Sequence, residues 1–267
     1  MTKETAATDL RDRIVAVLEG LWPEIHKEIL TRFPSVLAVS YKRYLSSAVP
    51  QTQMQTLIDL YETGLRLAGI IGLAKMTDSH AVTAKLPQLS HPSMGAWNEL
   101  NRALACVLPS ESAFASLQRT FDEKNISEII KARNNIAHGN ELSELKARSW
   151  LEPQKVQLRE WLTRLWQRLQ LRIFLVVNSE YDGLVMRNDA RALEGESAVL
   201  PTFLLNSKYP LSPERHIYYR QRHHRRPWWR LIHLQYSSRV TSSIAGAHLS
   251  VLRQNPMKWL INGFGRG

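Results

Sequence analysis

Apolar residues recur at three- and four-residue intervals through most of the first 175 positions, which is the spacing of helices that bury one face. The first stripe runs from Leu10 to Ile29 and stops at Phe33-Pro34, because proline disfavours a helical conformation in the residue before it. A second stripe, over roughly 52–74, is wider. That width predicts a helix at the centre of a bundle.

The segments that follow the second stripe alternate between helix breakers and short apolar stripes. Residues 75–95 contain prolines and glycine and are predicted to form a long loop. A short helix is expected over 97–107, and Pro109-Ser110-Glu111 has the composition of another helix start.

Two further helices are predicted before residue 175. Asn125-Ile-Ser-Glu128 resembles a capping box with Asn125 as the N-cap, and Gly139 stands where a helix commonly stops. Pro153 is expected to start the last helix, whose apolar stripe continues to Ile173.

Near residue 173 the pattern changes to short strand-like runs separated by turn residues, which suggests a small β meander docked on the bundle. The predicted fold is therefore mainly α, a four- to five-helix bundle followed by a small β-containing segment and an irregular basic tail. The predicted divisions are a helical bundle over 1–175, a β-rich appendage over 176–220 and the tail over 221–267.

Most of the net charge of +11 lies in the tail. Residues 221–267 contain eight Lys or Arg and no acid, which leaves 27 basic against 24 acidic residues elsewhere. One interpretation is a disordered basic arm for RNA or DNA, with Trp228 and Trp229 stacking on bases. The other is a frameshift near 219–221, because out-of-frame translation often yields acid-free sequence. Resequencing the locus would decide between them.

The composition also limits the chemistry. The single Cys106 excludes an internal disulfide and a cysteine-cluster metal site. No apolar run reaches the roughly 20 residues that span a bilayer, and the polar, acid-containing N-terminus is unlike a secretory signal. No glycine-rich phosphate loop or His-Glu-x-x-His motif is present. We expect a soluble cytoplasmic protein with no metal, cofactor or membrane contact.

The candidate chemistry centres on Arg133 and His138, near the end of the helix predicted to stop at Gly139. Arg133 interrupts the apolar stripe of that helix. Burying an unpaired guanidinium costs several kcal/mol, so it should meet an acid, a partner subunit or a phosphate. Asn134 and His138 are four residues apart and share a face. At about 100° per residue, His138 lies about 140° around the helix from Arg133.

A purely structural interpretation is also open. The helix dipole favours a histidine in the last turn, and Arg133 can pair with a carboxylate such as Glu62. The spacing alone is not specific, because Arg226 and His233 form a second match.

The segment Arg133-Asn134-Asn135-Ile136-Ala137-His138-Gly139 closely resembles the motif of HEPN domains (higher eukaryotes and prokaryotes nucleotide-binding). Their pattern is arginine, a polar residue, a few further residues and histidine at the end of a helix in a four- or five-helix bundle. The resemblance covers roughly 1–175. More loosely, Tyr41–Leu45 and Leu57–Arg66 resemble the upstream helices of a HEPN group found in bacterial defence and signalling proteins.

The resemblance implies that Arg133, Asn134 and His138 form a ribonuclease site. Catalytic HEPN members act as dimers without metal, by attack of the RNA 2′-hydroxyl on the adjacent phosphate, leaving a cyclic phosphate. It further implies a role in phage defence or as a toxin, with RNA as substrate and an antitoxin or defence protein as partner. Many members are not nucleases. The alternatives are a non-catalytic module that binds nucleotide, RNA or a protein, and a truncated relic of a longer protein.

Overall fold

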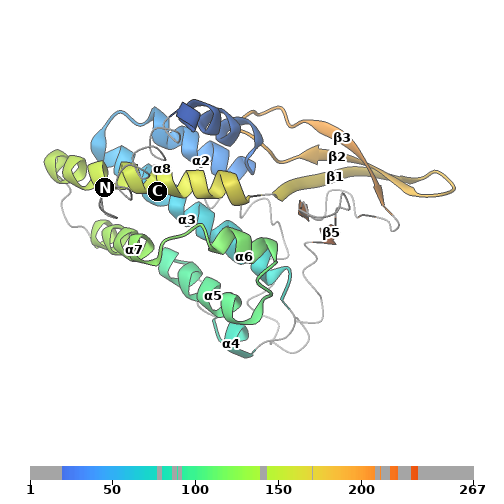
Figure 1. Cartoon of the computed structure of the whole chain (residues 1–267), viewed down its shortest axis with the longest axis horizontal. Coiled ribbons are helices and arrows are strands. Elements are labelled where there is room, and N and C mark those ends of the chain that lie inside the picture. Colours follow the sequence, from blue (N-terminus) through green and yellow to red (C-terminus); the bar gives the residue numbers. More distant parts are fainter. Residues whose placement is uncertain are drawn as a thin grey trace, which may run out of the picture.

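The computed structural model describes residues 20–76, 80–85, 89, 92–138, 143–169, 171–207, 211, 217–221 and 230–233. In this part of the chain the protein is mainly helical and carries a small antiparallel sheet (Figure 1). Residues 20–32 are helical and end before Pro34, as predicted. The helices that follow are α2 (Ser35–Ser46), α3 (Pro50–Leu73), α4 (His80–Thr83), α5 (Met94–Val107), α6 (Ala113–Gln118), α7 (Glu123–Ala137) and α8 (Glu144–Arg168).

The central helix of the bundle is α3, which contacts α2, α5, α6, α7 and α8. Its buried positions cover more than one face, so the prediction from the wide stripe is confirmed. Three glycines on α3 let large side chains approach the backbone. A Cβ atom on Gly64 would lie 2.8 Å from the Trp161 ring of α8, and one on Gly69 would lie 2.7 Å from the Trp97 ring of α5.

Gly64→Ala is expected to destabilise the fold by about 1–2 kcal/mol, because overpacking exceeds the gain in helix propensity. The Trp161 ring cannot retreat easily, since it stacks on Tyr61 and Phe121 at 4.5 and 5.5 Å between ring centroids. Gly20→Ala is the matched control, because nothing lies within 4 Å of a Cβ built there. Urea unfolding should show the two substitutions changing stability in opposite directions.

Two helices begin earlier than the sequence predicted. Asn125 is not the N-cap of α7: Asp122 occupies that position and accepts a hydrogen bond from the Asn125 backbone N–H at 2.8 Å. Pro153 does not start α8 but lies inside it, and Ser143 is the N-cap. Buried Ala147 and Leu151 continue the apolar stripe before the proline, and their burial offsets the backbone hydrogen bond that proline removes.

Smaller differences occur elsewhere in the helical region. The short helix α4 lies within the predicted 75–95 loop. The helix expected near Pro109 begins at Ala113, with Ser112 as its N-cap. The predicted stop at Gly139 lies outside the described residues.

The sheet follows α8 directly, and all of its strand pairs are antiparallel, in the order β3-β2-β1-β4-β5. The first three strands form the predicted meander, whereas β4 returns to the other edge of β1. Ile173, expected to end the last helix, lies in β1. The strands are β1 (Leu171–Tyr181), β2 (Met186–Ala192), β3 (Thr202–Ser207), β4 (Ile217–Gln221) and β5 (Arg230–His233).

Backbone hydrogen bonds join the segment between β2 and β3 to the first helices. The Ser35 N–H donates to the Leu193 carbonyl at 2.9 Å, and the Glu196 N–H donates to the Leu30 carbonyl at 2.9 Å. An ion pair between Arg172 and Glu194, 2.8 Å from Nε to Oε1, lies beside them. Of the tail, only Gln221 and β5 are described, so both interpretations of residues 221–267 stay predictions. No described helix is long and apolar enough to cross a membrane.

Burial in the core raises the pKa of the Tyr61 hydroxyl well above its ordinary value. The folded chain therefore holds this proton at a pH where the unfolded chain loses it, and stability falls as the pH rises above about 10. Tyr61→Phe should reduce this loss, although it also removes the acceptor of a 3.1 Å hydrogen bond from Asn125 Nδ2. Chemical unfolding of both proteins between about pH 8 and pH 11, a range that includes the ordinary tyrosine pKa, measures how strongly the stability of each protein depends on pH.

Candidate functional site

Helix α7 turns Arg133 toward α3. Its Nε lies 3.7 Å from Oε2 of Glu62, a carboxylate whose side chain is only 10% exposed. Glu62 also pairs with Arg66, one turn along α3. Of the three partners predicted for Arg133, the structure thus shows an acid, and it is the carboxylate named from the sequence.

The Arg133 guanidinium remains accessible in this arrangement. Its side chain is 31% exposed, and the contact with Glu62 is its only ion pair or hydrogen bond within the described residues. Glu62 meanwhile shares one negative charge between two guanidiniums, so the cluster of Glu62, Arg66 and Arg133 keeps a net positive charge. A half-exposed arginine held by a buried acid is suited to bind a phosphate oxygen through its free N–H groups.

His138 lies at the C-terminal end of α7. Its backbone N–H donates to the Asn134 carbonyl at 3.0 Å, so the last turn keeps its helical hydrogen bond and does not loosen. The side chains of His138 and Asn134 are exposed, and within the described residues neither has a hydrogen-bond partner. The His138 imidazole is therefore accessible to a ligand.

The described chain does not bring Arg133 and His138 into contact. Arg133 lies against α3, whereas Asn134 lies on an exposed position of α7 and His138 is the exposed C-cap residue of this helix. The angular separation expected from the sequence is therefore preserved. Arg133 and His138 of one helix therefore do not face the same phosphate. An arginine and a histidine would meet at one phosphate only if a second surface supplied one of the two.

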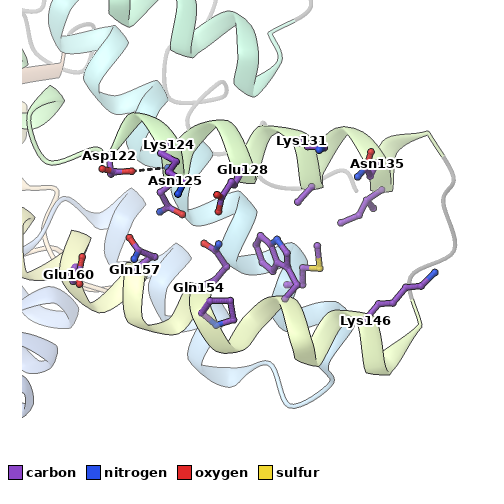
Figure 2. Close-up of a pocket in the computed structure, with 15 residues that line it drawn as sticks. Asp122, Lys124, Asn125, Glu128, Lys131, Asn135, Lys146, Gln154, Gln157 and Glu160 are labelled. Carbon is purple, nitrogen blue, oxygen red and sulfur yellow. Dashed lines mark hydrogen bonds between the residues drawn. The ribbon is translucent and has the colours of Figure 1, made fainter.

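A groove of about 860 Å³ lies between α7 and α8 (Figure 2). The sequence-based interpretation did not identify it. Its one available signal was polar residues at inward positions of two apolar helices: Asn125 is 5% exposed and Gln154 is 3% exposed. Lys131 and Asn135 place most of the groove on a different flank of α7 from the Glu62 contact.

No candidate metal site appears in the part of the chain that the structure describes, where no three His, Cys, Asp or Glu side chains gather. Cys106 is exposed, and so is His80 at the start of α4.

The chain has no significant match among protein-family models, curated proteins or solved structures. The resemblance to HEPN domains thus rests on the motif residues, and function must be argued from the site itself.

Proposed function

We propose that the protein is a metal-independent endoribonuclease of HEPN type that acts as a dimer in the cytoplasm. The observation that carries the proposal is the contrast at one helix end. Arg133 is anchored by the buried Glu62 yet keeps free N–H groups, and His138 stands exposed without a partner in the described chain. The first supplies fixed positive charge and the second a proton carrier, which are the two requirements of phosphodiester transfer.

The proposed reaction is attack of an RNA 2′-oxygen on the adjacent phosphorus. One His138 takes the proton of the 2′-hydroxyl as the new P–O bond forms, and a second delivers a proton to the 5′-oxygen as its bond to phosphorus breaks. Arg133 stabilises the charge that builds on the non-bridging oxygens, and Asn134 orients the phosphate or the histidine. The products are a 2′,3′-cyclic phosphate and a free 5′-hydroxyl.

A dimer supplies the two histidines and solves the geometric problem of α7. Because Arg133 and His138 lie on different sides of the helix, facing copies of α7 would place the arginine of one chain near the histidine of the other. This arrangement is part of the proposal, as are a role in phage defence or as a toxin and an antitoxin or defence protein as partner.

The decisive assay incubates the protein with total RNA in the presence of EDTA, beside an Arg133→Ala/His138→Ala double variant. We expect cleavage by the natural protein, with cyclic phosphate ends, and none by the variant. Absence of cleavage, or equal cleavage by both proteins, contradicts the nuclease proposal.

The groove between α7 and α8 favours a second candidate, a module that binds nucleotide, RNA or a partner without cutting. It is lined by both polar and apolar side chains and lies on a different flank of α7 from the Arg133 contact. Tight RNA binding by both the natural protein and the double variant, without cleavage, would support this function.

A further inference from the structure

The groove between α7 and α8 contains two buried carboxamides with unpaired oxygens. Asn125 Oδ1 and Gln154 Oε1 are inaccessible to bulk solvent and accept no hydrogen bond from any described residue. Asn125 Nδ2 donates a hydrogen bond to the Tyr61 hydroxyl, whereas Asn125 Oδ1 has no described partner. Buried acceptors without donors are unfavourable, so these atoms are suited to a ligand that brings N–H or O–H groups.

The polar side chains of the groove converge from both helices. Figure 2 shows Asn125 and Glu128 directed from α7 toward α8, and Gln154 and Gln157 directed from α8 toward α7. The two unpaired amide oxygens and the Glu128 carboxylate are all acceptors. The middle of the groove therefore favours a donor-rich group on the ligand.

The remaining walls favour a flat ligand with an anionic end. Half-buried Trp150 and buried Met54 supply apolar surface on which a planar ring can pack. Lys131 and Lys146 lie toward the end of the groove that is nearer to the C-terminus of α7, whereas Lys124 lies with two acids, Asp122 and Glu160, toward the other end (Figure 2). Positive charge is thus concentrated on the side of the molecule that carries His138.

We propose that this groove binds one nucleotide whose base carries an exocyclic amino group. The Asn125 and Gln154 side chains would turn their oxygens into the groove to accept the amino group of adenine, cytosine or guanine. The ring would pack on Trp150, and the phosphate would meet Lys131 and Lys146. Uracil has no amino group. It offers one N3–H donor between two carbonyl oxygens, so it would leave at least one of the two buried acceptors unpaired. A volume of about 860 Å³ accommodates a ligand of this size.

For RNA, this inference rests on the proposed function and assigns the groove the role of base selection beside the cleaved phosphate. Free nucleotides share the same chemistry, so the test includes both sources. Calorimetry with 5′-AMP and 5′-UMP measures the free ligand, and short oligo(A) and oligo(U) strands measure RNA. We expect both adenine-containing ligands to bind the natural protein about tenfold more tightly, the effect of one hydrogen bond to a buried group.

Gln154→Leu removes one acceptor at nearly constant volume and should abolish most of this preference. Gln167→Leu is the matched control, because Gln167 is exposed on the same helix and does not line the groove. Lys146→Ala provides a second test that does not disturb the core, since Lys146 is exposed. It should weaken binding of AMP and leave that of adenosine unchanged.

Equal binding of AMP and UMP by the natural protein, or an unchanged preference in Gln154→Leu, overturns the inference. Failure of the nuclease proposal is distinguishable from this result. If the protein prefers AMP and Gln154→Leu loses that preference, but no RNA is cleaved, the inference about the groove stands and the nuclease proposal fails. If the protein cleaves RNA at any base and Gln154→Leu is equally active, the nuclease proposal stands and the inference about the groove fails. Preference for free AMP without preference for oligo(A) would limit the site to mononucleotides and contradict base selection.

Discussion

His138→Ala is expected to lower RNA cleavage by about 100- to 10,000-fold, the usual contribution of a positioned general acid or base. The substitution should leave the fold intact. The imidazole is exposed and without a described partner, so its removal costs only the interaction with the helix dipole, less than about 1 kcal/mol. Initial cleavage rates and thermal unfolding of the same preparation measure the two effects. If the substitution destabilised the fold enough to unfold the protein in the assay, the lost activity would result from unfolding and not from the missing imidazole.

The control for this substitution is His80→Ala. His80 is also exposed, and it lies on α4, which contacts α5. Its removal is expected to change neither cleavage nor stability. If His80→Ala lowered cleavage as much as His138→Ala, the loss of activity could not be assigned to the C-terminal end of α7.

The dimer can be tested with the same proteins. An excess of the Arg133→Ala/His138→Ala chain, added to natural protein and allowed to exchange, should lower the rate per natural chain. Mixed dimers would contain incomplete sites, because Arg133 and His138 of one chain lie on different sides of α7. An unchanged rate would mean that one chain contains the whole site.

The positions of the helices could be predicted because burial of one face is a local pattern. The stripe over 52–74 corresponds to α3, Pro50–Leu73, and its width reflects the surrounding helices. Helix starts were harder to predict, since several residues can cap one helix. Asp122 and Asn125 are both suitable N-caps. In the fold, Asp122 accepts the backbone N–H of Asn125, and the Asn125 side chain is instead used in a tertiary hydrogen bond to Tyr61.

The residue types of the candidate site were identifiable from the sequence, but their spatial relations were not. Glu62 was one of several acids that could neutralise Arg133, and the packing of α3 against α7 selects it. The groove was missed because it depends on how far α7 and α8 stand apart. That separation is set by the whole bundle and leaves no local signal beyond two polar residues in apolar stripes.

Glu62→Gln is expected to lower both stability and cleavage, because it removes the carboxylate that Arg66 and Arg133 share. Loss of one member of a buried ion pair costs about 3–5 kcal/mol. Here the arginine side chains are 18% and 31% exposed, so water screens part of the effect, and we expect about 1–3 kcal/mol. Urea unfolding measures this change.

The same substitution distinguishes a positioning role of Glu62 from a purely structural one. With Arg133 no longer anchored, kcat should fall at least tenfold even under conditions where the variant is fully folded, because a misplaced guanidinium stabilises the phosphoryl charge poorly. Glu62→Asp retains the charge and should recover part of the rate. The control is Glu28→Gln, since Glu28 pairs with Arg32, an exposed arginine, on a helix that carries none of the site residues. Full activity of folded Glu62→Gln would show that the carboxylate supports the fold alone and that Arg133 needs no anchor.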